Sequence, residues 1–158
     1  MIQFQKHKQS IEILILNSPI NPESNAITSA TESGDILLVN CEPALSRLAR
    51  AALGEQHRVE SAQTVEMALH AIGKRAYAIV LLEFSPIEQR SCEALQQLWA
   101  CPQRPPLVVL TTDTSRETRR RLIGLGVAGL LYMPFTIDAL RTTVADIVSR
   151  ASVNPSPA

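Results

Sequence analysis

The chain has 158 residues, and its 15 basic residues balance 15 acidic ones, so its formal net charge is zero. This length fits one domain with extensions, and a hydrophobic content of 46% is enough to build a core. A neutral chain has no general electrostatic attraction to nucleic acid or to a membrane surface, so we expect neither as a direct partner.

The cysteines and histidines do not have the spacing of a metal site, and we expect no metal and no cofactor. An odd number of cysteines without a recognisable secretory signal is typical of reduced thiols, which predicts a cytoplasmic location. The apolar run at 11–16 is too short for a signal-peptide core, and no run approaches the roughly 20 apolar residues that span a bilayer. The cysteines are Cys41, Cys92 and Cys101, and the histidines are His7, His57 and His70.

Both ends of the chain differ in composition from its middle. Residues 1–34 form an N-terminal extension, with one apolar, strand-like segment at 11–16 and a linker rich in Ser, Asn, Thr and Pro after it. We expect the apolar segment to dock on the folded domain or to mediate self-association, and a disordered extension is the alternative. Residues 151–158 contain two prolines and are expected to form a disordered tail.

From residue 35 to residue 150, aliphatic runs alternate with amphipathic segments, a pattern that predicts β-strands alternating with α-helices. Five such units joined by short links predict an α/β domain in three layers, a doubly wound parallel sheet with helices on both faces. We expect strands at 35–40, 57–60, 77–83, 107–111 and 127–131, and helices at 43–53, 64–73, 90–99, 116–125 and 136–150.

The helix ends and inward faces follow from residue types. Pro43 fits a first helical turn, where its missing N–H costs nothing. Side-chain oxygens predict N-caps at Thr64, Ser115 and Thr136. Glycines predict helix ends at Gly54 and near Gly124 and Gly126. The spacing of apolar residues predicts that the first helix turns Ala44, Leu45, Leu48, Ala52 and Leu53 inward, the third Leu95 and Leu98, and the last Ile137, Leu140, Val144, Ile147 and Val148. Trp99 is also expected in the core.

Polar or unusual residues follow four of the predicted strands. In parallel sheets, ligands bind beyond the carboxyl ends of the strands. We therefore expect five residues that are far apart in sequence to lie together there. They are Asn40, Cys41, Glu83, Thr111 and Met133.

Three segments match a known pattern without a gap: the strand and turn at 36–43, the strand at 77–83, and the stretch from Gly126 to Phe135. In these segments the chain resembles the receiver domain of bacterial two-component response regulators, over roughly residues 35–150. The resemblance implies a flavodoxin-like fold with strand order 2-1-3-4-5. It also implies a place in phosphorelay signalling.

In that family the four strand ends carry an acidic pair, a phosphate-accepting Asp, a Ser or Thr, and a Lys. Here only Thr111 matches, so the resemblance implies a degenerate phosphoacceptor site. Divalent cations such as Mg²⁺ prefer carboxylate oxygens, and Asn40 and Cys41 supply none. Glu83 is one methylene longer than Asp, and Met133 removes the ammonium group. We therefore expect a pseudo-receiver.

Several residues of this site allow two interpretations. Glu83 either imitates a permanently charged acceptor or is a solvated strand-end carboxylate. Thr111 either hydrogen-bonds Glu83 or, as we favour, is an ordinary strand-end threonine. Leu130 stands where the family often has an aromatic switch, and Tyr132 is displaced from that position, which argues against coupling through a rotating ring.

Cys41 is either a redox sensor or, as we favour, a small buried apolar residue. The neighbouring charges of Glu42 and Glu83 are expected to disfavour its thiolate.

The resemblance favours a non-enzymatic, phosphorylation-independent module that binds a kinase, a regulator, an output protein or a second copy of itself. No DNA-binding or enzymatic output domain is recognisable after residue 150, so we expect output through a partner. The alternative is a receiver that a histidine kinase still phosphorylates. A third class, an unrelated α/β enzyme or ligand binder, is disfavoured because no Gly-rich phosphate loop or nucleophile elbow is present.

The family commonly docks or dimerises through the surface of its fourth helix, fifth strand and fifth helix, here about 115–150. Within that stretch, four arginines and one glutamate lie close together in sequence. They form either a basic docking patch or, more commonly, a solvated helix face with Glu117 paired to Arg121. The candidate partner surface comprises Arg116, Arg119, Arg120, Leu130 and Tyr132.

Overall fold

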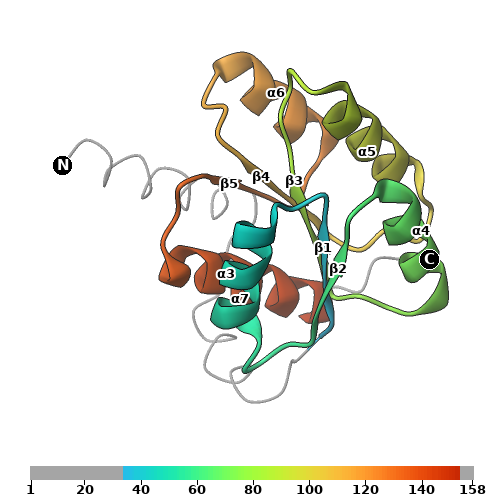
Figure 1. Ribbon diagram of the computed structural model, residues 1–158, viewed down its shortest axis with the longest axis vertical. Coiled ribbons are helices and arrows are strands. Elements are labelled where there is room, and N and C mark those ends of the chain that lie inside the picture. Colours follow the sequence, from blue (N-terminus) through green and yellow to red (C-terminus); the bar gives the residue numbers. More distant parts are fainter. Residues whose placement is uncertain (1–33, 154–158) are drawn as a thin grey trace.

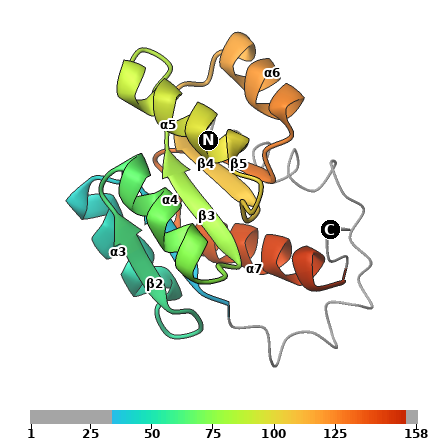
Figure 2. The same cartoon turned by 90° about the vertical axis from the view of Figure 1, so that its right-hand side faces the viewer.

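The computed structural model describes residues 34–153, which form five parallel strands and five helices (Figures 1 and 2). Strands and helices alternate along the chain, as the sequence predicts. The elements are β1 (Ile36–Val39), α3 (Pro43–Leu53), β2 (Val59–Ala62), α4 (Val65–Lys74), β3 (Ile79–Glu83), α5 (Gln89–Ala100), β4 (Leu107–Thr111), α6 (Arg116–Leu125), β5 (Gly129–Tyr132) and α7 (Ile137–Val153).

The sheet order is β2-β1-β3-β4-β5, with every pair of neighbours parallel. The predicted α/β class, three-layer flavodoxin-like arrangement and order 2-1-3-4-5 are therefore confirmed. Between successive strands the chain returns over one face of the sheet as a helix, so all five strands run in the same direction and end at the same edge. The strand order reverses after β2: β2 lies on one side of β1 and β3 on the other, so β1 and β3 are neighbours inside the sheet.

Each face of the sheet has its own apolar core. The cores lie beneath the helices that cover the sheet in Figure 1. Side chains alternate along β1: Ile36 and Leu38 pack with α3 and α7, and Leu37 and Val39 pack with α4, α5 and α6. All four are at most 1% exposed. Burial on both faces explains why the central strands are continuous aliphatic runs with no polar alternation.

The predicted helix ends hold at several positions. Thr64 accepts a hydrogen bond from the amide of Met67, and Thr136 accepts one from the amide of Ala139. Ser115 caps α6 by accepting from the amide of Thr118. Gly126 ends α6 in the left-handed region at φ 89°, where a side chain is strained. Pro43 is the first residue of α3, as expected.

Gly54 ends α3 differently from the expectation. Its φ is −67°, so the chain leaves this helix through a right-handed turn rather than a left-handed glycine cap. Ala44 and Ile137 were expected in the core and are exposed, Ile137 by 41%. Both lie in the first turn of their helices, before the helix reaches the sheet, so only later turns contribute to the core. Trp99 is half-buried beside the core, with the guanidinium of Arg104 4.0 Å from its ring centre.

The boundaries of every strand except β4 differ from the predictions by one or two residues. β2 covers Val59–Ala62 rather than 57–60, because His57 precedes the strand as a buried side chain whose Nδ1 lies 3.1 Å from the Gly34 carbonyl oxygen. α7 continues to Val153, into the segment expected to be a tail. Predictions on the apolar segment at 11–16, the linker and the end of the tail fall on residues 1–33 and 154–158, outside the described residues.

Candidate functional site

The predicted site residues lie together at the carboxyl edge of the sheet. Val39 of β1 is paired with Leu82 of β3. The residues that follow them, Asn40 and Glu83, are therefore neighbours. On the other side of β3, the amide of Met133 donates a 2.8 Å hydrogen bond to the carbonyl oxygen of Thr111. The fold therefore gathers residues from four strand ends, as the sequence predicts.

Glu83 is the centre of this site. Its Oε2 accepts a 2.8 Å hydrogen bond from the backbone amide of Glu42, in the loop between β1 and α3. Burial raises the pKa of the Glu83 carboxyl, and the charges of Glu42 and Glu88 act in the same direction, against the lowering effect of the Glu42 amide. Among residues 34–153, no basic side chain forms an ion pair with Glu83. Its carboxylate is thus held by a backbone amide and by no cation.

Asn40 turns the chain from β1 into the loop that holds Glu83. Its φ is 55°, in the left-handed region that asparagine tolerates better than most residues. The turn places the amide of Glu42 where it meets the Glu83 carboxylate. An asparagine immediately after an aliphatic strand was the sequence signal for such a turn.

Cys41 is a half-buried thiol. Its Sγ lies 3.5 Å from the carbonyl oxygen of Val39 and 3.9 Å from that of Leu81, and it donates to both. Burial, with the charge of Glu83 second, raises the pKa of Cys41 to about 12. The predicted penalty on the thiolate therefore holds in direction, although burial outweighs the carboxylate. A protonated thiol is a poor nucleophile, which argues against a redox sensor.

Thr111 is fully buried and is occupied by its own loop. Its Oγ1 accepts a 3.1 Å hydrogen bond from the amide of Asp113, and no hydrogen bond joins it to Glu83 in the described part of the chain. Asp113 in turn accepts hydrogen bonds from the amide and the hydroxyl of Ser115, the residue that caps α6. The structure therefore favours the interpretation of Thr111 as a strand-end residue that shapes the turn into α6.

Met133 is half-buried and packs against the core beneath α3 and α7. A thioether at this strand end supplies no positive charge. The charges that the family places around its acceptor are thus missing on both sides of Glu83.

The donor atoms of this edge do not fit a divalent metal. Mg²⁺ is bound through carboxylate oxygens and water in near-octahedral geometry. Only Glu83 supplies a carboxylate among the five residues, and one of its oxygens is taken by the Glu42 amide. Across residues 34–153, no group of three or more His, Cys, Asp or Glu side chains is placed to hold a metal ion.

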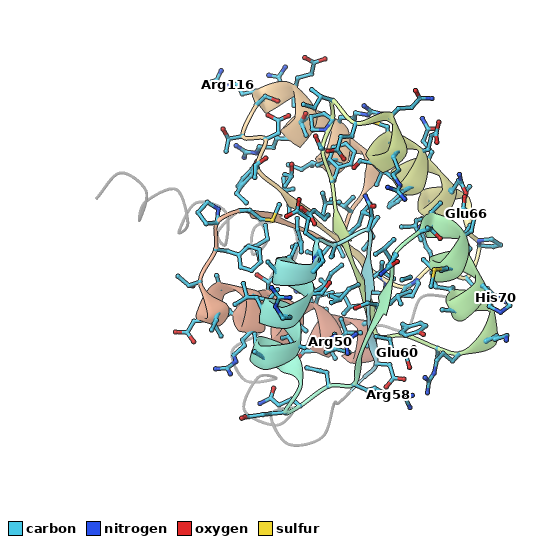
Figure 3. The ribbon with its side chains drawn as sticks, viewed as in Figure 1. Arg50, Arg58, Glu60, Glu66, His70 and Arg116 are labelled. Carbon is cyan, nitrogen blue, oxygen red and sulfur yellow. The ribbon has the colours of Figure 1, made fainter. Side chains whose placement is uncertain are left out.

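The predicted partner surface is present only in part. Leu130 is 3% exposed, because this position of β5 faces the core under α6, so it is not available to a partner and the prediction is wrong there. Tyr132 is half-buried at the end of β5, and the positive charge of Arg119 acts on its hydroxyl. Arg116 and Arg120 are exposed; Figure 3 shows Arg116 on the N-terminal end of α6.

No helix among the described elements combines the length and the apolar content needed to cross a membrane. The Glu42 amide could not be recognised from the sequence as part of the site, since a backbone group has no residue type of its own. Ile123 was also not predicted as part of the partner surface; it is 36% exposed, one turn beyond Arg119 and Arg120 on α6. Its position four residues after Arg119 was the available signal.

The fold is shared with solved receiver domains. The receiver domain of the Francisella response regulator 1452 superposes with a TM-score of 0.66 at 18% identity, over 75% of this chain and 99% of that one. The domain has the receiver fold. The receiver domain of a Vibrio parahaemolyticus LuxO repressor gives a TM-score of 0.69 at 19% identity, over 78% and 95% of the two chains. Vibrio cholerae CheY4 gives 0.63 at 22% identity, over 73% and 98%.

Sequence comparison points in the same direction. The chain is 24% identical over 127 residues to the transcriptional regulatory protein ZraR of Klebsiella oxytoca, which supports the response-regulator family. This alignment covers 80% of the chain but only 29% of ZraR. No family model matches the chain. The resemblance to receiver domains is therefore confirmed in fold, and the loss of phosphorylation stays a prediction.

Proposed function

We propose that this receiver domain is a phosphorylation-independent pseudo-receiver that acts in signal transduction by binding a protein partner. It performs no enzymatic reaction of its own, and its working location is the cytoplasm of a bacterial cell. The single observation that carries the proposal is the 2.8 Å hydrogen bond from the Glu42 amide to Oε2 of Glu83. That bond engages the carboxylate at the acceptor position with the chain's own loop.

The surroundings of Glu83 support the same proposal. Phosphoryl transfer depends on positioning and on cations that neutralise the developing charge. Neither Asn40 nor Cys41 supplies a carboxylate to hold such a cation, and Met133 has no charge to offer. The alternative of a phosphorylatable receiver depends on Thr111, the one residue that keeps its family type.

The partner surface that we propose lies on α6. Arg116, Arg119, Arg120 and Ile123 are spaced to form one exposed stripe, and Tyr132 adjoins it through Arg119. None of these arginines forms an ion pair within residues 34–153, and neither does Arg121, so the expected pair with Glu117 is not formed. An unpaired basic stripe beside an apolar side chain fits an acidic protein surface with an apolar contact.

Charge reversal on the two sides of α6 tests this surface. The unchanged protein, here called the parent, is used as bait for affinity capture from a lysate of the native host. Quantitative mass spectrometry identifies the proteins that it retains. A partner is a retained protein whose captured amount does not change when acetyl phosphate is added. We expect Arg120→Glu to reduce that capture by about tenfold, and Arg121→Glu, on the other side of α6, to leave it within about twofold. Equal losses in both variants would contradict the stripe, and capture that requires the phosphodonor would contradict phosphorylation independence.

A further inference from the structure

A pocket with two arginines and two serines in its lining lies between α3 and the end of the edge strand β2. Its volume is about 250 Å³. It opens at the same edge of the sheet as Glu83 but on the outer side of β1. Its lining residues are Leu38, Cys41, Pro43, Ser46, Arg47, Arg50, Ser61, Ala62 and Gln63.

The sequence builds this pocket from two periodicities. Pro43, Ser46, Arg47 and Arg50 are spaced by three or four residues, so they share one face of α3. On β2, alternation turns Ser61 toward α3, whereas its neighbours Glu60 and Ala62 face the other side of the sheet. One helical face and one strand edge thus converge on the same space.

The polar groups of the pocket carry positive charge without a counter-charge. Nη2 of Arg50 donates a 3.0 Å hydrogen bond to the hydroxyl of Ser61, and Figure 3 shows Arg50 between α3 and β2. Arg47 forms no ion pair in the described part of the chain, and no acidic side chain lines the pocket. By contrast, Arg58 and Arg75 at the opposite end of the sheet are both paired with carboxylates.

These features match the chemistry of phosphate recognition. Guanidinium groups bind phosphate oxygens with two parallel hydrogen bonds, and serine hydroxyls add further donors. The pocket runs along one face of α3, from Pro43 in its first turn to Arg50 in its last turn, so both arginines border the same space. Its volume is below the roughly 300–1,000 Å³ of sites for drug-sized ligands, so it suits a small phosphorylated compound better than a nucleotide.

We propose that this pocket binds a small phosphate monoester through Arg47 and Arg50, with Ser46 and Ser61 as hydroxyl donors. Binding there acts on the loop of the main site, because Cys41 and Pro43 line the pocket and flank Glu42, whose amide holds Glu83. The binding claim is independent of the proposed loss of phosphorylation. The pocket would give the domain an input that does not pass through Glu83.

NMR titration of the full chain tests the proposal, with glycerol 3-phosphate as the probe and inorganic phosphate and sodium chloride at matched ionic strength as comparisons. We expect saturable shifts of the amides of Ser46, Arg47 and Ser61 with both phosphates and none with chloride. Arg47→Gln should weaken binding of glycerol 3-phosphate by about tenfold or more. Arg121→Gln on α6, outside both the pocket and the proposed stripe, makes the same change in charge and should leave binding unchanged.

Ser61→Asp is a second variant, which places a carboxylate beside Arg50 and should abolish binding while keeping the domain folded. Circular dichroism and thermal melting establish folding for each variant. Shifts that rise linearly without saturation would overturn the proposal, and so would a loss of binding in Arg121→Gln equal to that in Arg47→Gln. Binding of inorganic phosphate with no binding of the ester would overturn the assignment to a phosphate monoester.

Discussion

The two ends of the sheet shift the pKa of a carboxyl group in opposite directions. At the amino end, Glu60 accepts a 2.6 Å hydrogen bond from the hydroxyl of Tyr77 and forms ion pairs with Arg58 and Arg75. Figure 3 shows Arg58 and Glu60 close together there. These contacts, led by the hydrogen bond of Tyr77, lower the pKa of the Glu60 carboxyl.

At the carboxyl end, Glu83 has a backbone amide as its partner and no cation, and burial raises the pKa of its carboxyl. Carboxyl groups with perturbed pKa values cluster at functional sites, and ion-pair networks that only stabilise the fold perturb pKa values as well. The amino end is therefore stabilised by its charges, whereas the carboxyl end keeps a destabilised charge in the place where receivers have their acceptor.

The largest expected effect comes from restoring the charges that the carboxyl end lacks. We expect a variant with Asn40→Asp, Cys41→Asp, Glu83→Asp and Met133→Lys to be phosphorylated by acetyl phosphate in the presence of magnesium to an extent orders of magnitude above that of the parent. It would again supply carboxylate ligands for the metal, an Asp acceptor and a lysine cation. Intact-mass spectrometry measures the gain. Equal phosphorylation of the single variant Glu83→Asp would show that Asn40 and Met133 are not disabling.

A smaller effect is expected at the amino end. Tyr77 is 7% exposed, and its hydroxyl donates a hydrogen bond to Glu60. Tyr77→Phe removes that hydroxyl and should lower the free energy of unfolding by about 1–2 kcal/mol. Tyr132→Phe is the matched control at the other end of the sheet. The Tyr132 hydroxyl makes no hydrogen bond within residues 34–153, so that change should stay within about 0.5 kcal/mol. Urea denaturation compares the two, and equal losses would contradict the contrast between the ends.

The smallest effect, and the sharpest in sign, is the pH dependence of stability. The lowered pKa of Glu60 contributes stability that is present above its unfolded pKa of about 4.3 and is lost in acid, so Glu60→Gln should destabilise the domain more at pH 7 than at pH 3. The raised pKa of Glu83 costs stability as pH rises above the same value. Glu83→Gln should therefore gain stability relative to the parent between about pH 4 and pH 7. Thermal melting across this range gives the change in stability of each variant relative to the parent as a function of pH. This change should have slopes of opposite sign for Glu60→Gln and Glu83→Gln, and slopes of the same sign would refute the contrast between the two ends.

Periodicity and strand chemistry were enough to predict the α/β class and the elements β4 and α6 to the residue. Strong signals bound these elements: prolines before Leu107, Ser115 before α6, and the glycines Gly124 and Gly126 near the end of α6. The start of β2 was less predictable, because the buried His57 resembles a strand residue in sequence although it contacts Gly34. The strand order came from the resemblance to receivers rather than from periodicity.

The site was predictable in its membership but not in its contacts. Strand ends in a parallel sheet must converge, which places Asn40 beside Glu83. The bond from the Glu42 amide depends on the left-handed turn at Asn40, a backbone geometry that the sequence only permits. The exposure of Leu130 was predicted wrongly, because the alternation of β5 decides which side chains face α6.

The proposed loss of phosphorylation is tested most directly by the intact mass of the parent chain after incubation with acetyl phosphate and magnesium. The variant with all four substitutions is the positive control. We expect the mass of the parent to stay unchanged under conditions in which this variant gains one phosphoryl group. Addition of one phosphoryl group to the parent, removed by the substitution Glu83→Gln, would contradict the claim and identify the chain as a receiver that still accepts phosphate.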